Sequence, residues 1–474
     1  MTKKSQTLLF LFFVCLFFLI APILVLYSQG YRLDIEKKRI VQTGGLFLKI
    51  QPTGADIYID SKFQKKTNIL FPSALIQNLI PKKHKIQVKK QGFFPWQKTL
   101  EIKEKQVTEA KNIILVPKNP KFEILAPYRT EDSNLELNKN INTENFWFSP
   151  SQKNLILKEV DKNGWHLKLY NTEKKVKSYL ISEQDISKKQ VEIIDLKFSA
   201  DSKKILLKTG LKEQLKYFII DLAKSPAGLI PLDFLGKNIE QVSFNPKDST
   251  KIFFLKNNQL FEGNPIDKKI SPAFLKDVLT YQVVSEKIYF LEKSGFIFET
   301  TLSFNHKEKL NKTPFRLKTE TGYKLETLDD FIFLREEKNI YLFDLQSKSF
   351  KRFCEATVDL ILSPDSKKIA YINNNEIWVF FLKDITGQPK RKTGDKVFLT
   401  RFSKKIDHIF WYSPFYLIFN CGNKIKVAEI DDRDTLNIVD LAKFNKPKIF
   451  FNQNNKKLYI LSHGNLYVSE KLLR

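Results

Sequence analysis

The stretch from Leu360 to Val379, LILSPDSKKIAYINNNEIWV, decides how most of the chain folds. Residues 363–366 are Ser, Pro, Asp and Ser. These residues favour tight turns, because Pro fixes φ while Asp and Ser side chains bond the nearby backbone. Two short apolar runs follow at residues 369–372 and 377–380, separated by three asparagines. Short apolar runs bounded by turn formers indicate β-strands. The stretch therefore predicts two short strands after a polar turn.

Variants of this unit recur after about residue 120, at intervals of roughly 34 to 50 residues, a spacing typical of propeller blades. We expect a β-propeller of about eight blades, with seven as the alternative. The last unit has room for only three strands, so we expect the spare strand Phe122–Ala126, or residues near 122 to 128, to complete it and close the ring. The predicted units start near Phe146, Leu196, Val242, Tyr281, Leu325, Leu360, Ile409 and Ile449.

Two units carry a more specific pattern. They read Ser-Pro-Asp-Ser-Lys-Lys-Ile at 363–369 and Ser-Ala-Asp-Ser-Lys-Lys-Ile at 199–205. They resemble the WD40-like (PD40) repeat of periplasmic TolB-type propellers, which reads Phe-Ser-Pro-Asp-Gly-Lys-Lys-Ile-Ala. Ser366 and Ser202 stand where that repeat has glycine. The resemblance implies that residues 121–474 form the propeller, although the fourth and fifth units rest on spacing alone.

The amino-terminal segment LLFLFFVCLFFLIAPILVLY, residues 8–27, carries no charge. Its length of about 20 residues is enough to cross a bilayer as a helix. We interpret it as an uncleaved transmembrane signal-anchor; a cleaved signal peptide is the alternative, but its apolar run would be shorter and would end in a small-residue cleavage site. Residues 1–7 are then a short cytoplasmic tail and residues 28–44 a juxtamembrane linker. Lys3 and Lys4 favour this orientation, with the C-terminal bulk extracytoplasmic in a single-pass cell-membrane protein, although basic residues also follow the span.

Short alternating strands at 46–50, 55–59, 85–89, 97–102 and 110–116 predict a small β-sandwich before the repeats. Pro52-Thr53-Gly54-Ala55, then Ile57-Tyr58-Ile59-Asp60, a Leu79–His84 turn and Gly92-Phe93 resemble the PEGA domain in order. The resemblance covers about Gly45 to Val116, so we place the domain at residues 45–117, and it implies a surface-exposed sandwich with no catalytic residues. Ser61 replaces a turn glycine, and Lys82-Lys83 replaces the glycine before His84. We interpret Gly54 and Gly92 as turn positions and His84 as a strand-edge residue.

The net charge of +27 comes from 79 Lys and Arg against 52 Asp and Glu. A basic surface attracts polyanions such as nucleic acid, acidic lipid or anionic wall polymers. The joint abundance of Lys, Asn, Ile and Phe favours compositional bias as the explanation, with a polyanion partner as the alternative. The three cysteines, Cys15, Cys354 and Cys421, form no metal-binding pattern. We expect Cys354 and Cys421 to be buried free thiols, with a disulfide between them as the alternative.

No nucleophile elbow, phosphate-binding loop, dinucleotide fingerprint or zinc-protease motif occurs in the sequence. The sequence therefore predicts no catalytic, cofactor or metal residues and no cofactor. His166, His306, His408 and His463 fall in separate units. The cluster 431–434, Asp-Asp-Arg-Asp, is expected to be a solvated turn, with cation binding as the alternative. Asp201 and Asp365 are expected to cap turns, and Trp147, Trp165, Trp378 and Trp411 to be core residues rather than stacking platforms.

The predicted fold class is thus all-β after one transmembrane helix: a PEGA-like sandwich, then a propeller. The predicted function is that of an exported, membrane-anchored binding or scaffolding protein of a bacterial envelope. Its propeller loop face would engage a wall polymer, a polysaccharide or a protein partner, at residues that the sequence does not identify. One alternative is a glycosidase- or lyase-like enzyme with paired carboxylates at the propeller axis. The other is capture of DNA or another polyanion by a basic face.

Overall fold

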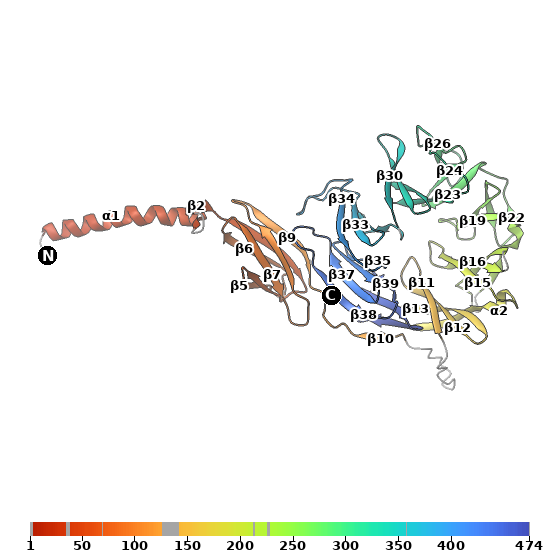
Figure 1. Ribbon diagram of the computed structural model, residues 1–474, viewed down its shortest axis with the longest axis horizontal. Helices are drawn as coiled ribbons and strands as arrows, with labels where there is room; N and C mark the ends of the chain where they lie inside the picture. The colour runs from red at the N-terminus through yellow and green to blue at the C-terminus, as the bar shows by residue number, and fades with distance from the viewer. Residues whose placement is uncertain are drawn as a thin grey trace.

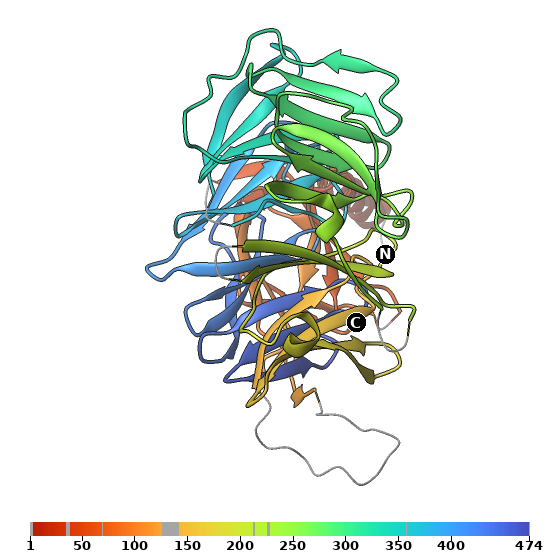
Figure 2. The same cartoon turned by 90° about the vertical axis from the view of Figure 1, so that its right-hand side faces the viewer.

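The computed structural model describes residues 3–34, 38–68, 70–125, 142–211, 214–224, 228–356 and 358–473. Figure 1 shows three parts in a row: an N-terminal helix, a small β-sandwich and a ring of β-sheets. Figure 2 views the molecule from the ring, with the sandwich and the helix behind it. The sandwich therefore lies between the helix and the ring.

Helix α1 spans Lys3–Ser28 and contains Pro22. Within it, Leu8–Ser28 is the one segment among the described residues that is long and apolar enough to cross a membrane, and none of its window is buried inside the protein. At its end, the Arg32 guanidinium donates to the Tyr27 carbonyl oxygen at 2.7 Å and lies over the Tyr27 ring. The segment is an apolar helix that serves either as a signal sequence or as an anchor.

A two-stranded hairpin, β1 (Tyr31–Asp34) with β2 (Arg39–Gln42), joins the helix to the sandwich. It occupies most of the predicted linker 28–44. Thr43 also donates its backbone N–H to the Gly30 carbonyl at 2.9 Å, so the start and end of the hairpin are held together.

The sandwich packs a three-stranded sheet, in the order β6-β3-β9, on a four-stranded sheet, in the order β5-β4-β7-β8. Strands β3 and β9 run parallel, and the other pairs run antiparallel. The seven strands are β3 (Gly44–Gln51), β4 (Asp56–Ile59), β5 (Lys62–Lys66), β6 (Ser73–Leu79), β7 (Lys83–Lys89), β8 (Trp96–Glu101) and β9 (Val107–Ile114). The expected sandwich is thus confirmed.

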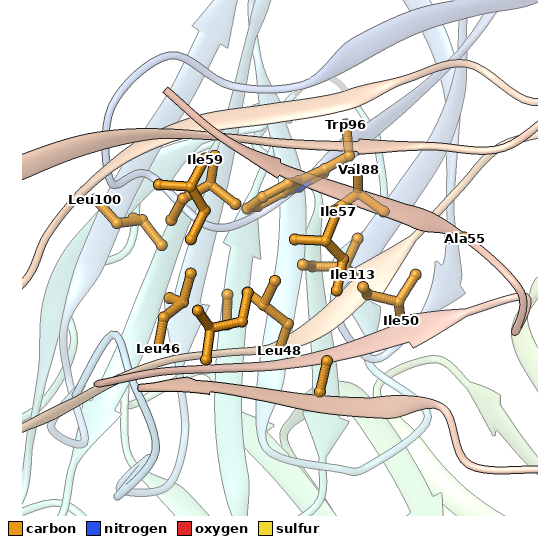
Figure 3. Packing of buried hydrophobic residues seen from close by; sticks show 14 of the residues in the cluster. Leu46, Leu48, Ile50, Ala55, Ile57, Ile59, Val88, Trp96, Leu100 and Ile113 are labelled. Atoms are coloured by element: carbon orange, nitrogen blue, oxygen red, sulfur yellow. The ribbon is translucent and has the colours of Figure 1, made fainter. Parts of the chain in front are cut away.

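Alternate side chains from both sheets fill the sandwich core, as Figure 3 shows for Leu46, Leu48, Ile57 and Trp96. The departure from glycine at Ser61 leaves the turn intact: Asp60 and Ser61 have φ values of 50° and 68°, the left-handed region that glycine favours. His84 is more than a strand-edge residue. It is buried, and its ring lies 2.7 Å from both the Asp60 carboxylate and the Ile80 carbonyl, so it ties two turns together.

The remaining described residues form eight four-stranded antiparallel sheets, which confirms the expected eight blades. Blades 1 to 4 comprise β11 (Asn142–Phe148), β12 (Asn154–Asp161), β13 (Gly164–Asn171), β14 (Val176–Ser182); β15 (Glu192–Phe198), β16 (Lys204–Leu211), β17 (Gln214–Asp221), β18 (Gly228–Pro231); β19 (Ile239–Phe244), β20 (Ile252–Lys256), β21 (Gln259–Asn264), β22 (Lys269–Ile270); and β23 (Val278–Val284), β24 (Lys287–Glu292), β25 (Ile297–Thr301), β26 (Lys307–Lys309). Short helices α2 (Glu183–Ile186) and η1 (Asp233–Leu235) follow blades 1 and 2.

Blades 5 to 7 comprise β27 (Tyr323–Leu328), β28 (Phe331–Glu336), β29 (Asn339–Asp344), β30 (Ser349–Glu355); β31 (Ile361–Leu362), β32 (Lys368–Asn373), β33 (Glu376–Phe381), β34 (Lys396–Arg401); and β35 (Ile406–Ser413), β36 (Tyr416–Cys421), β37 (Lys424–Glu429), β38 (Ile438–Lys443). Blade 8 takes three strands from the C-terminal end of the chain and one from before blade 1: β39 (Lys448–Asn452), β40 (Lys457–Ser462), β41 (Asn465–Ser469) and β10 (Phe122–Ile124).

Strand β10 closes the ring. It pairs antiparallel with β41 through Phe122↔Ser469 and Ile124↔Tyr467, and the Leu125 amide donates to the Leu466 carbonyl at 2.8 Å. The expected closure is confirmed for residues 122–125, and the rest of the 122–128 segment lies outside the described residues. A separate cluster of buried apolar side chains joins each blade to the next, including blade 8 to blade 1. Figure 1 accordingly shows β39 beside β11.

The two PD40-like turns share one geometry. Ser202 and Ser366 have φ values of 60° and 53°, so each serine adopts the conformation that the repeat's glycine provides. The Ser363 hydroxyl accepts from the Lys368 amide at 2.9 Å and donates to Asp365 at 2.5 Å. Ser199 makes the equivalent bonds to Lys204 and Asp201. These bonds fix where each second strand starts.

Candidate functional site at the sandwich–propeller junction

The sandwich contacts the propeller with one pair of edge strands, β8 and β9. Edge strands carry backbone N–H and C=O groups that no neighbouring strand uses. Two propeller segments meet them: residues 382–395, between β33 and β34 of blade 6, and residues 430–437, between β37 and β38 of blade 7. Side chains from these segments satisfy backbone groups of both edges.

Two amide side chains act in place of a missing neighbour strand. Asn437 accepts from the Gln97 N–H at 3.1 Å and donates to the Gln97 carbonyl at 3.0 Å. Gln388 accepts from the Glu109 N–H at 3.0 Å and donates to the Val107 carbonyl at 3.3 Å. A primary amide offers the same donor and acceptor as a peptide group, so each side chain reproduces a β-bridge. One amide covers the edge of each sheet.

The cluster at 431–434 belongs to this contact. Asp434 accepts from the Thr99 N–H at 2.7 Å, and the Asp431 carbonyl accepts from the Lys98 ammonium at 2.7 Å. Arg433 pairs with the Asp431 carboxylate at 2.6 Å and donates to the Glu109 carbonyl at 2.9 Å. The segment is a loop between strands in which Asp432 and Asp434 remain exposed, in line with the expectation, but it also bonds to the sandwich, which sequence spacing does not reveal. Within the described residues, no group of three potential metal ligands forms, here or elsewhere.

A buried ion pair lies at the centre of the junction. The Lys98 ammonium is 2.6 Å from the Glu429 carboxylate, with side-chain exposures of 0% and 3%. Glu429 also accepts from the Trp96 indole N–H at 2.7 Å and from the Asn437 side chain at 2.8 Å. Burial raises the pKa of the Glu429 carboxyl, and the nearby Lys98 opposes that rise. Both oxygens of the Glu429 carboxylate accept hydrogen bonds, which stabilises the pair although it is buried. Removing either partner would leave the other charge buried and unpaired.

A cavity of about 270 Å³ opens beside this pair, between β9 and the turns of blades 6 and 7. Its apolar walls include Ile113, Phe381 and Phe415, and charged side chains such as Lys367 and Arg391 stand around it. Lys368 also lines it; this side chain is buried, pairs with Asp365 at 2.6 Å, and burial lowers its pKa. Burial acts to raise the pKa of Asp365, but the bonds from Lys368 and Ser363 outweigh it and hold that pKa low.

Apolar contacts complete the junction on the side of blade 8. Val116 is buried in the cluster that joins blades 7 and 8, and Phe94 packs against it. The Tyr416 hydroxyl accepts from the Ile114 N–H at 3.1 Å, and burial raises the pKa of Tyr416. Polar edge contacts, a buried ion pair and a shared apolar cluster together hold the two domains in one orientation. Sequence reasoning missed these residues.

The histidines that the sequence analysis considered lie in separate blades, as expected. His166 pairs with Asp161 in blade 1 at 3.0 Å, and His463 contacts Asn445 in blade 8 at 2.9 Å. His408 in blade 7 has its pKa lowered by burial, and His306 lies in blade 4, 3.9 Å from Glu308.

The other candidates have structural partners. Asp201 accepts from Ser249 of the next blade at 3.0 Å, in addition to capping its own turn. Trp165 and Trp411 are buried and donate to the carbonyls of Val191 and Ile361. Trp147 and Trp378 are half-buried and pack in blade clusters.

Cys354 and Cys421 are free thiols, as expected, but only Cys421 is buried, whereas Cys354 is half-buried. Burial raises the pKa of Cys354 to about 12 and also raises that of Cys421. Such thiols are poor nucleophiles at neutral pH, because the thiolate is the reactive form.

Residues 43–116 match the family model of the PEGA domain. No curated protein matches the chain. Solved structures with a similar arrangement include the Dos1 propeller, 11% identical with a TM-score of 0.46, over 75% of this chain and 95% of that one. The β-propeller domain of Cps50 (Swd1) from Myceliophteria thermophila is 12% identical with a TM-score of 0.38, over 70% and 99%. The computationally designed protein Ika8 is 12% identical with a TM-score of 0.42, over 70% and 96%.

The propeller assignment rests on the strand order and on the closure by β10. It does not depend on the similarity to these solved structures. The chain thus combines an N-terminal apolar helix, a region that matches the PEGA domain and a propeller of about eight four-stranded blades.

Proposed function

We propose that the chain is a membrane-anchored, extracytoplasmic binding or scaffolding protein of the cell envelope. The observation that carries the proposal is the junction, which fixes the propeller on the sandwich directly after the apolar helix. Once the chain is anchored, a propeller held in this way stays near the membrane and keeps one orientation relative to the sandwich. That geometry suits capture of a partner at a defined distance better than free diffusion of a soluble domain.

The face available to a partner follows from the topology. In a four-stranded antiparallel blade, the turns between the first and second strands lie at the same end as those between the third and fourth strands. The sandwich occupies this end at blades 6 and 7. The opposite end carries the short turns between second and third strands, which include Asn257-Asn258, Glu337-Lys338 and Asn374-Asn375. We assign partner binding, to a wall polymer, a polysaccharide or an envelope protein, to this second end.

Charge pairing on the inner strands supports binding rather than catalysis. Asp195 lies 3.2 Å from Lys197, and Asp407 lies 3.0 Å from Lys405. Glu326 pairs with Arg335 at 2.8 Å, and the pairing with Arg335 and Lys324 keeps its pKa low although burial opposes this. A carboxylate held ionised by neighbouring cations, as that of Glu326 is, is a poor general acid, because an acid must hold its proton at the working pH.

The first experiment tests anchoring. The full chain is expressed with a C-terminal tag, and the membrane fraction is washed with alkaline carbonate before intact-mass measurement. An anchor leaves the chain in the membrane at its full mass. A mass that lacks the apolar segment would contradict anchoring and favour a signal sequence.

The second experiment tests the binding face with two charge-matched double variants. Lys162→Glu with Lys338→Glu alters exposed second-to-third-strand turns in blades 1 and 5, whereas Lys174→Glu with Lys348→Glu makes the same charge change at the opposite end of these blades. Binding is measured against wall polysaccharides, anionic polymers and DNA at two salt concentrations. We expect salt-resistant binding to one partner that only the first variant weakens. Binding to every polyanion that vanishes at high salt would contradict the proposal and favour non-specific attraction to the basic surface.

A further inference from the structure

The side of the sandwich away from the propeller exposes an unusual set of apolar side chains. Strands β5 and β6 form the edges opposite β8 and β9 and are consecutive in the chain. Phe63 on β5 is 58% exposed, and Leu70 and Phe71 between the two strands are 79% and 64% exposed. Three large apolar side chains this exposed on one edge of so small a domain favour an interaction surface over chance.

The same edge is basic. All five residues of β5 are exposed, and three of them are lysines: Lys62, Lys65 and Lys66. Lysines on an edge strand prevent pairing with other chains, which explains their presence. They do not explain Phe63, Leu70 and Phe71, because exposed apolar groups on an edge promote association. Lysines interleaved with exposed Phe and Leu are instead the composition that binds an anionic lipid surface.

The position of this edge fits a membrane. Figure 1 shows α1 leaving the sandwich on the side away from the propeller, which is also the side of β5 and β6. The hairpin that joins α1 to the sandwich continues the pattern: Leu33 and Ile40 are directly paired across β1 and β2, and both are largely exposed. Arg39 beside them is exposed as well. A bilayer crossed by α1 would therefore meet the hairpin first and the β5–β6 edge next.

We propose that the β5–β6 edge rests on the anionic headgroup region of the bilayer that α1 crosses, with Leu70 and Phe71 inserted and Lys62, Lys65 and Lys66 facing lipid phosphates. This inference rests on the proposed anchoring. It adds a second membrane contact, so that the sandwich lies on the lipid instead of swinging from the helix. Because the junction holds the propeller on the sandwich, the contact would also set the direction in which the binding face points.

The test places a fluorescent reporter at the edge. The full chain carrying Phe71→Trp is reconstituted in nanodiscs of phosphatidylglycerol with brominated acyl chains, which quench tryptophan only at short range. The control is Leu345→Trp, at a highly exposed position in blade 5. We expect the bromolipid to remove most of the fluorescence that Phe71→Trp adds and none of that from Leu345→Trp. Leu70→Trp provides a second reporter should the first misfold.

Charge reversal and lipid composition sharpen the result. Adding Lys62→Glu, Lys65→Glu and Lys66→Glu, or replacing phosphatidylglycerol with phosphatidylcholine, should abolish most of the quenching. Unquenched reporters at both 70 and 71 in chains that remain in the nanodisc would overturn lipid docking and leave anchoring intact. Loss of the chain from the nanodisc would overturn anchoring and, with it, this inference. Equal quenching at Leu345→Trp would also overturn docking, since it would place the propeller against the lipid.

Discussion

The two long sides of the sandwich deal with unpaired strand edges in opposite ways. On the side of β8 and β9, Gln388 and Asn437 of the propeller occupy the backbone groups as a neighbouring strand would. On the side of β5 and β6, no described residue of the propeller contacts the strands. Lysines there lie next to exposed Phe and Leu side chains. An edge closed by polar side chains commits a domain to one protein partner. An edge that carries both lysines and exposed apolar side chains suits a surface without fixed geometry, such as lipid.

The largest effect on this comparison should come from the buried ion pair. Glu429→Ala leaves the Lys98 ammonium buried without its carboxylate, which should lower the free energy of unfolding by about 3–5 kcal/mol. Urea unfolding of the full chain in detergent measures this. The double variant Lys98→Met with Glu429→Met is the control and should recover much of the loss, because an apolar pair needs no counter-charge. A double variant less stable than Glu429→Ala would contradict the explanation.

The amide bridges should come next. Asn437→Ala and Gln388→Ala each remove two hydrogen bonds to a strand edge and should each cost about 1–2 kcal/mol. Hydrogen exchange at the Gln97 and Glu109 amides reports the loss directly, and each variant should speed exchange at its own contact. Gln87→Ala is the matched control, since its side chain bonds only to the exposed Gln97 side chain. Unchanged exchange in Asn437→Ala would show that the bridge is not formed.

Lowering the pH should weaken the contact between the propeller and the β8–β9 side by a smaller amount. The Thr99 amide holds the pKa of Asp434 below its ordinary value of 3.8, so this carboxylate contributes stability above that pH and loses it as the pH falls through the lowered pKa. Because Asp434 is largely exposed, the loss should be under about 1 kcal/mol. Exchange of the Thr99 amide against pH measures it. Asp434→Asn should remove the acid-dependent step, since an amide oxygen accepts the bond but does not titrate; a step that persists would assign it to another group.

Substitutions on the side of β5 and β6 should barely change the free energy of unfolding. Lys62→Glu with Lys65→Glu and Lys66→Glu changes three exposed side chains and should alter the unfolding free energy by no more than about 0.5 kcal/mol. Urea unfolding of the full chain in detergent measures this change as well. We expect any effect of the triple variant to appear only when the chain is in a membrane. A loss comparable to that of Glu429→Ala would mean that β5 supports the fold and would remove the contrast between the two sides.

Much of the architecture could be predicted because its signals are local. The turn at 363–366 and its copies mark the connection from the first to the second strand of a blade, and even the degenerate fourth and fifth units are correctly placed at β23 and β27. The spare strand at Phe122 was recognisable because the last unit was one strand short. Each of these signals needs only a few neighbouring residues.

The junction could not be predicted in the same way, because its partners are distant in the sequence: Trp96 and Glu429 are 333 positions apart. One signal was available. In β8, Lys98 occupies an inward position between the buried Trp96 and Leu100. A lysine at an apolar position of an alternating strand requires a buried acid. Nothing local identifies that acid as Glu429, and the contacts that the cluster beginning at Asp431 makes with the sandwich were missed for the same reason.

The closure of the ring by β10 has a consequence for how the chain acquires its structure. Lys121 and Glu470, which bond beside this closure, are 349 positions apart. When the chain is synthesised from its amino-terminal end, the sandwich can fold early from its own strands, whereas β10 must wait for the last blade. Contacts between such distant segments form slowly, since a long loop must close first. Strand β10 and the unpaired edge of the most recently formed blade are then exposed to chaperones and proteases until the ring closes.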